Sequence, residues 1–123
     1  MSKPIEELLA PKPDARLRIY AWTPKDPPAA YVDLIKVGQT TLEDVNVRIK
    51  QSQGQMRQPY LLHVDAIAER EDGSIFLDGD VRQRLVEKGF ENPIIEASRD
   101  WMRCTPEDVK TAVTELQNGC SRS

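Results

Sequence analysis

The chain has 123 residues, of which 39% are apolar and 30% are charged, and its net charge at pH 7 is −3. A chain of this length supports one modest hydrophobic core and is too short for two domains. The acidic balance argues against a protein that coats nucleic acid nonspecifically, because that mode of binding depends on many Lys and Arg contacts to phosphate. A local basic cleft remains compatible with this composition.

Two cysteines, Cys104 and Cys120, and a single histidine are too few for a disulfide framework or a His-rich metal site. We therefore expect reduced thiols and a cytoplasmic location. The N-terminus is acidic and interrupted by proline, with no apolar stretch long enough for a signal peptide or a membrane span, so no membrane partner is expected. The predicted organisation is a tail or docking segment over residues 1–15, one domain over 16–118 and a short tail over 119–123.

Two strands are predicted in the first third of the chain. The first covers residues 17–23 and alternates between two faces, with Ile19 and Ala21 on one side and Tyr20 and Trp22 on the other. A loop rich in proline follows, and a second apolar run then predicts a strand that ends in a tight turn at Gly38.

A helical pattern begins after Gly38, where Thr41 and Asp44 fit a loose form of the capping box. Arg48 lies on the flank of the apolar stripe of this helix, so we expect its guanidinium to be held in a defined direction. The helix should end at Gly54. Its stripe is formed by Leu42, Val45 and Ile49.

Residues 60–69 alternate and predict a third strand, with one apolar face made of Tyr60, Leu62, Val64, Ala66 and Ala68. The pair Asp72-Gly73 signals a reversal, and residues 75–77 are expected to form a short return strand. Asp78 is the expected N-cap of a second helix that ends at Gly89.

The clearest helix follows a linker over residues 90–102. Thr105 caps it, Pro106 occupies its first turn, Asp108 completes a capping box, and residues 118–119 close it. The order strand, strand, helix, strand, short strand, helix, helix predicts an α+β fold: a small, mainly antiparallel three-stranded sheet flanked by helices.

Two motifs and one arginine stand in a suggestive order. Arg18-Ile19-Tyr20 is followed by Lys36-Val37-Gly38, and Arg48 lies ten residues beyond that glycine. This pattern resembles the GIY-YIG nuclease superfamily, in the branch whose second motif reads K-I-G and which often forms the N-terminus of phage or bacterial helicase or restriction-like proteins. The likeness continues through residues 76–90 and 100–110, so it covers all but the two ends of the chain.

The resemblance implies a GIY-YIG-like domain that acts as a metal-dependent DNA endonuclease. Tyr20 would position or deprotonate the attacking water, Arg48 would stabilise charge on the scissile phosphate, and Asp78 or Asp80 would hold one Mg²⁺ or Mn²⁺ ion. Such chemistry suits the residue types, because a phosphodiester gains negative charge as it is cleaved. Lys36 would lie near the water, where its positive charge could lower the pKa of Tyr20 from its ordinary value of about 10.

The unit of strand, glycine and helix also predicts where DNA would bind, because a phosphate could lie at the end of the strand. We expect contacts to nucleic acid from Gly38, Gln39, Thr40 and Trp22. Through the resemblance, a fused or associated helicase is a further expected partner, and the chain would then be a piece of a larger helicase or restriction-like protein.

Each of these residues has a structural alternative. Tyr20 could be a core aromatic residue, Arg48 could pair with Asp44, and Asp78 could do no more than cap its helix. The chain also departs from the family pattern, since its metal ligand would be Asp rather than Glu, and Arg82 stands where relatives place a histidine. These departures favour an alternative function: a degenerate GIY-YIG-like domain that binds nucleic acid or protein without cleaving.

Overall fold

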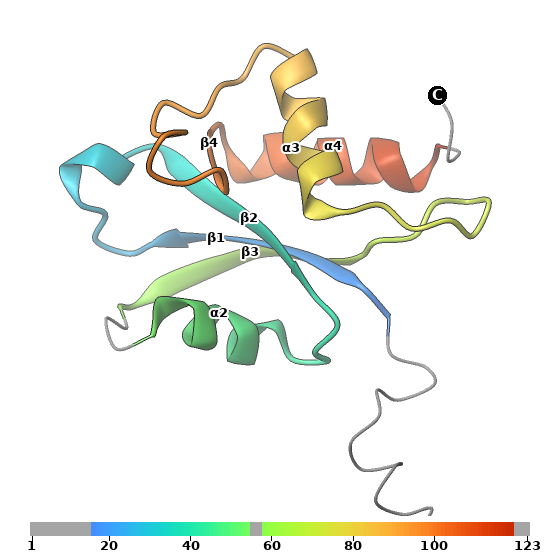
Figure 1. Ribbon diagram of the computed structural model, residues 1–123, viewed down its shortest axis with the longest axis horizontal. Coiled ribbons are helices and arrows are strands. Elements are labelled where there is room, and N and C mark those ends of the chain that lie inside the picture. The colour runs from blue at the N-terminus through green and yellow to red at the C-terminus, as the bar shows by residue number, and fades with distance from the viewer. Residues whose placement is uncertain (1–15, 55–57, 120–123) are drawn as a thin grey trace, which may run out of the picture.

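The computed structural model describes residues 16–54 and 58–119. Its centre is an antiparallel sheet of four strands in the order β3-β1-β2-β4 (Figure 1). The strands are β1 (Arg18–Pro24), β2 (Leu34–Thr40), β3 (Tyr60–Ile67) and β4 (Trp101–Arg103). The α+β class and the antiparallel pairing are as predicted, but the sheet has a fourth strand, β4, which begins at the end of the predicted linker and extends one residue beyond it.

Helices lie on both faces of the sheet. In Figure 1, α2 (Val45–Gln53) lies below it, and α3 (Asp78–Glu87) and α4 (Pro106–Gln117) lie above it. A short 3₁₀ turn, η1 (Ala29–Tyr31), precedes β2. None of the helices in the described residues combines the length and the apolarity needed to cross a membrane. The tail predicted over residues 1–15 lies outside the described residues, as does Cys120, while Cys104 is a free thiol.

Two apolar cores follow from the alternation along β1. Ile19 and Ala21 pack in the larger core, against α3 and α4, whereas Tyr20 and Trp22 pack in the smaller one, against α2. The predicted two-faced character of this strand is therefore confirmed. The smaller core, called the aromatic core below, is half aromatic and consists of Tyr20, Trp22, Leu34, Val45, Ile49 and Trp101.

A β-bulge divides β3 between these two cores. Ala21 pairs with Val64 but the next residue, Trp22, pairs with Leu62, so His63 is the extra residue. Because a bulge reverses the alternation, Tyr60 packs on the α2 side while Val64 packs on the opposite side. The prediction of a single apolar face over residues 60–69 was therefore wrong.

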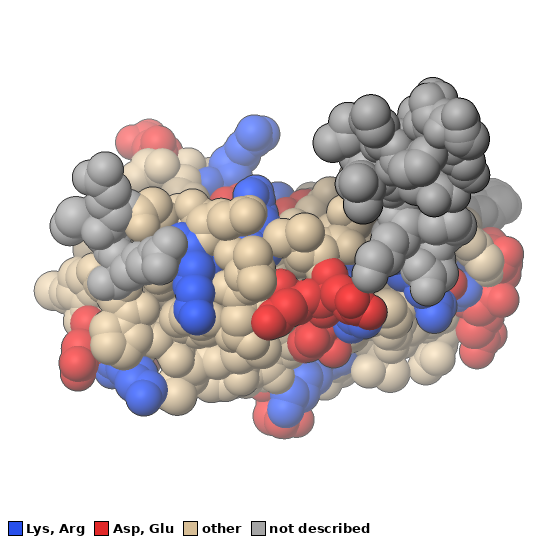
Figure 2. All heavy atoms as spheres, turned by 90° about the horizontal axis from the view of Figure 1, so that it is seen from below, with Lys and Arg blue, Asp and Glu red and all other residues tan. Residues whose placement is uncertain are grey.

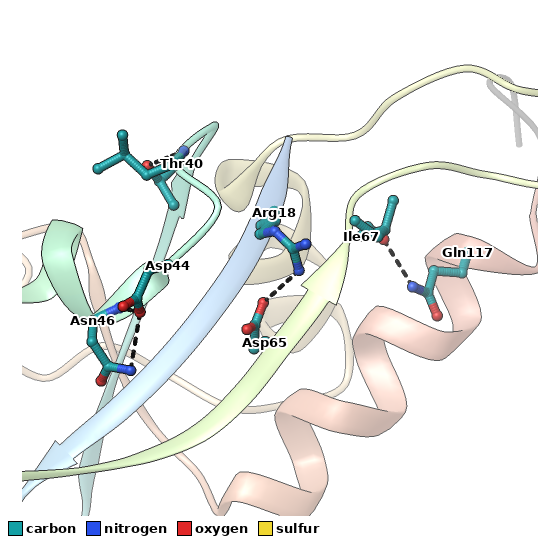
Figure 3. Close-up of polar contacts among 8 residues, drawn as sticks. Arg18, Thr40, Asp44, Asn46, Asp65, Ile67 and Gln117 are labelled. Atoms are coloured by element: carbon teal, nitrogen blue, oxygen red, sulfur yellow. Dashed lines mark hydrogen bonds and ion pairs between the residues drawn. The ribbon is translucent and has the colours of Figure 1, made fainter. Parts of the chain in front are cut away.

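The start of α2 differs from the prediction based on Thr41. Asp44 is the N-cap, and its carboxylate accepts a hydrogen bond from the backbone N–H of Asn46 (Figure 3). Leu42 lies before the helix and is 38% exposed, so it does not belong to the apolar stripe. Gly54 ends the helix as expected, with a φ of 62° that favours glycine.

The other two helices are largely as predicted. In α3 the N-cap is Leu77, so Asp78 is the first helical residue rather than the cap. Residues 75–77 form no return strand, and only an isolated bridge joins Glu69 to Ile75. The predicted capping box of α4 is confirmed, and Gln117 ties this helix to β3 by donating to the carbonyl of Ile67 at 2.8 Å (Figure 3).

Candidate functional site

The site lies at the point where β4 stops covering the edge of β2. The β4 strand pairs with β2 only as far as Lys36, which lies opposite Trp101. Beyond it the N–H of Val37 donates to the carbonyl of Asp100 at 2.8 Å, and the carbonyl of Val37 accepts from the guanidinium of Arg82 at 2.9 Å. Polar groups therefore replace a neighbouring strand at this edge.

Tyr20 crosses β2 at Gly38, its partner in the β1–β2 pairing. A Cβ atom at Gly38 would lie 2.5 Å from both Cζ and Oη of Tyr20, which is closer than atoms can approach. Glycine is needed here because the tyrosine ring occupies the space of a side chain. The predicted tight turn at Gly38 was wrong, since β2 continues to Thr40.

The hydroxyl of Tyr20 lies among charged groups. Burial is the largest effect on its pKa and raises it above the ordinary value. The charge of the nearby Arg48 guanidinium opposes the rise, and its capacity to hydrogen-bond the hydroxyl adds to that effect, whereas the carboxylates of Asp100 and Asp78 raise the pKa further. The net result is a neutral phenol that can donate a hydrogen bond at physiological pH. Arg48, not Lys36, is therefore the cation that acts on Tyr20, and the predicted lowering of this pKa by Lys36 was wrong.

The helix α2 aims Arg48 at this hydroxyl. Val45 and Ile49 anchor one face of the helix in the aromatic core, and the hydroxyl of Tyr60 donates to the side chain of Asn46. Arg48 is itself exposed, so its outer nitrogen atoms are accessible from solvent. The sequence left open that Arg48 does no more than pair with Asp44, but Arg48 also acts on the pKa of Tyr20.

Lys36 is half-buried and lies two residues before Gly38, on the same face of β2. It lies between Trp22 and Trp101 in the sheet, and its Nζ atom is 5.8 Å from the centroid of the Trp22 ring. Burial lowers the pKa of Lys36, and the nearby charge of Arg48 lowers it further, while Asp100 raises it. A partly buried cation is stabilised by an anionic partner, so Lys36 is suited to contact an anion.

Two carboxylates that act on the pKa of Tyr20 share one guanidinium. Nη1 of Arg82 lies 3.2 Å from Asp78 and 3.6 Å from Asp100. Asp100 was not among the residues predicted for the site. In the sequence, Asp100 stands directly before the apolar pair Trp101-Met102, which is buried. Its spacing from Tyr20 does not indicate that the two residues lie close together.

Of the two acids predicted to bind metal, the structure brings only Asp78 to Tyr20. Asp80 accepts a hydrogen bond from the N–H of Leu77 at 2.8 Å and so serves the start of α3. No cluster of three or more His, Cys, Asp or Glu side chains suited to a metal occurs within residues 16–54 and 58–119. Asp78 and Asp100 nevertheless offer the hard oxygen ligands that Mg²⁺ takes, one or two at a time together with water.

The residues predicted to contact nucleic acid are engaged within the protein. Gln39 accepts a hydrogen bond from the N–H of Asp78 at 2.8 Å, and Thr40 accepts one from the N–H of Leu42 at 3.0 Å. Gly38 lies beneath the Tyr20 ring, and Trp22 is part of the aromatic core. Contacts of these four residues with DNA stay a prediction.

No family model, curated protein or solved structure matches this chain.

Proposed function

We propose that this domain cleaves a phosphodiester bond of DNA in the manner of a GIY-YIG endonuclease. The observation that carries the proposal is the surroundings of the Tyr20 hydroxyl, whose pKa responds to the nearby guanidinium of Arg48 and to the carboxylates of Asp78 and Asp100. A hydroxyl, a cation and two acids that converge from four parts of the chain are more than the packing of an aromatic residue requires.

Each group has a defined task in this proposal. Arg48 binds the scissile phosphate through its exposed nitrogen atoms and stabilises the charge that develops there. Tyr20 orients the attacking water through its neutral hydroxyl, and Lys36 attracts the phosphate backbone. Asp78 and Asp100 would hold one Mg²⁺ or Mn²⁺ ion, which polarises the phosphate when bound.

Plasmid nicking tests the proposal directly. Supercoiled DNA is incubated with Mn²⁺ and either the wild-type protein, Arg48→Ala or Tyr20→Phe, and the relaxed form is measured against time. We expect both variants to be at least about 100-fold slower, as is usual when a group that stabilises the transition state is removed. Lys50→Ala is the matched control, because it removes an exposed cation two residues further along α2.

If wild type nicks no faster than Arg48→Ala, the nuclease proposal fails. The second candidate is then a domain that binds DNA without cutting it. The ion pairs of Arg82 with Asp78 and Asp100 favour that candidate, because a guanidinium competes with a metal ion for the same oxygen atoms. The proposed association with a helicase would apply equally to either function.

A further inference from the structure

A pocket lies beside the candidate site, on the side of the sheet covered by α2. It has a volume of about 340 Å³, near the lower end of the range of small-molecule sites, roughly 300–1,000 Å³. Lys36 belongs to both the pocket and the candidate site, because it lines the pocket and because the charges of Arg48 and Asp100 shift its pKa. The pocket therefore adjoins the candidate site at Lys36.

The walls of the pocket are aromatic. Trp22, Tyr31 and Trp101 line it, and their rings pack edge to face. The Trp22 and Trp101 centroids are 5.4 Å apart at 73°, and those of Tyr31 and Trp101 are 4.8 Å apart at 72°. Trp22 and Trp101 are 5% and 8% exposed and form the rigid base of the pocket, so a flat ligand would pack against the half-buried Tyr31 and the exposed margins of the two indoles.

The polar groups at the pocket differ in their hydrogen bonding. The indole N–H of Trp22 is buried and finds no acceptor among the described residues, although a tryptophan in a core usually has one. Gln53 and Gln58 also line the pocket, and the Gln53 amide donates to the carbonyl of Gln58 and accepts from its N–H, both at 3.3 Å. A ligand with an aromatic ring and ring acceptors would complement the aromatic walls and the exposed Gln58 side chain.

The charge of Lys36 decides between the classes of ligand that aromatic pockets bind. Trimethylammonium groups, which such pockets often accept, would be repelled by the amine. An aromatic ring joined to an anion is attracted by the same amine, and a nucleotide is such a ligand. Single-stranded nucleic acid is held in this way elsewhere, by stacking on aromatic side chains next to a cation.

We infer that the pocket binds one unpaired nucleobase of a DNA strand whose phosphate reaches Lys36 and Arg48. The identity of the strand as DNA rests on the proposed function. The inference adds the substrate class: the domain recognises DNA with an unstacked base beside the bound phosphate, such as a single-stranded end, a flap or a flipped nucleotide.

Tryptophan fluorescence tests this inference, because the only two tryptophans of the chain both line the pocket. The wild-type protein is titrated with a short single-stranded oligonucleotide and, in parallel, with an abasic strand of the same length, both without divalent metal. We expect quenching by the strand with bases, and an affinity about 5- to 100-fold higher than for the abasic strand. Equal affinities for the two strands would overturn the inference.

Two variants separate a binding role from a structural one. Trp22→Phe keeps an aromatic ring but is smaller and lacks the unpartnered N–H, so base-dependent affinity should fall several-fold, and its melting temperature is measured alongside to show that the fold is kept. Lys36→Met should weaken both strands, whereas the exposed Lys25→Met should weaken neither. If Trp22→Phe and Lys36→Met both bind like wild type, the pocket is not the site.

The outcomes for the pocket and for the proposed function are distinct. Plasmid nicking together with equal binding of the two strands would leave the nuclease proposal intact and remove the pocket. Base-dependent quenching without nicking would support the pocket in a domain that binds and does not cut.

Discussion

At the scale of single residues, the site depends on one close approach. The Tyr20 ring crosses β2 only because Gly38 has no side chain, and this crossing carries the hydroxyl from the aromatic core to the open edge of the sheet. There the pKa of the hydroxyl responds to the guanidinium of Arg48 in α2 and to the carboxylate of Asp78 in α3. The glycine therefore sets the position of the tyrosine, and both residues belong to one structural unit.

Gly38→Ala should destabilise the protein by about 1–3 kcal/mol, because the new methyl group overlaps the tyrosine ring. Urea unfolding measures this change in the free energy of unfolding. The same substitution in a Tyr20→Leu background should cost clearly less, since the smaller side chain leaves room for the methyl group. An equal cost in both backgrounds would show that the overlap with Tyr20 is not the cause.

The charges around Tyr20 predict how its ionisation responds to mutation. Because Arg48 opposes the rise caused by burial, Arg48→Ala should raise the pKa of Tyr20 further. NMR of the labelled tyrosine Cζ carbon against pH would detect the shift, and Lys50→Ala should leave the pKa unchanged. An unchanged pKa in Arg48→Ala would mean that the arginine does not reach the hydroxyl.

The same raised pKa has a consequence for stability. Folding favours the neutral phenol, so the contribution of Tyr20 is fully present below pH ~10, the ordinary pKa of tyrosine, and is lost as pH rises through the higher pKa of the folded state. Lys36 acts in the opposite sense, because its lowered pKa makes its contribution grow as pH rises toward ~10.5. Above pH ~10 we therefore expect Tyr20→Phe to lose less stability than wild type in urea unfolding.

At the scale of elements, the sequence predicts what local patterns determine. The alternation along β1, the glycine that ends α2 and the capping box of α4 are confirmed, because each depends on neighbouring residues. The strand β4 was missed, since three residues are too few to show a period and its pairing with β2 joins distant segments. Asp100, directly before β4, was missed for the same reason.

One side chain of α3, Arg82, contacts both the sheet and the two acids of the candidate site. Arg82 is mostly buried and binds the carbonyl of Val37 together with the carboxylates of Asp78 and Asp100. It stands where the GIY-YIG pattern that the sequence resembles has histidine, so the sequence indicated a departure from that pattern but not its effect. The arginine stabilises the fold at the place where the proposed metal ion would need the same oxygen atoms.

Arg82→Gln should therefore have two opposite effects. The free energy of unfolding should fall by about 1–3 kcal/mol, because a charged hydrogen-bonding group is lost. Mn²⁺ should bind at least several-fold more tightly, as measured by calorimetry, because the two carboxylates no longer share a guanidinium. Arg84→Gln on the same helix is the control, since Arg84 pairs with Glu115 instead. Unchanged Mn²⁺ affinity would argue against Asp78 and Asp100 as ligands.

At the scale of the whole molecule, the acidic chain presents cations sparingly. On the face covered by α2, basic and acidic side chains are interspersed (Figure 2). Several arginines are already paired, among them Arg16 with Glu69 and Arg18 with Asp65. A domain of this kind would hold DNA by a few placed contacts rather than by a broad basic surface.

The salt dependence of binding measures how many such contacts form. If Lys36 and Arg48 supply the main phosphate contacts, the logarithm of the affinity for duplex DNA should fall with the logarithm of salt concentration with a slope of about −2, close to one per phosphate contact. Arg48→Ala should make this slope shallower by about one, while Lys50→Ala should not change it. Fluorescence anisotropy of a labelled duplex at several salt concentrations gives both values. A slope of about −6 or steeper would mean that many other cations carry the binding, and the two residues at the edge of β2 would then not account for it.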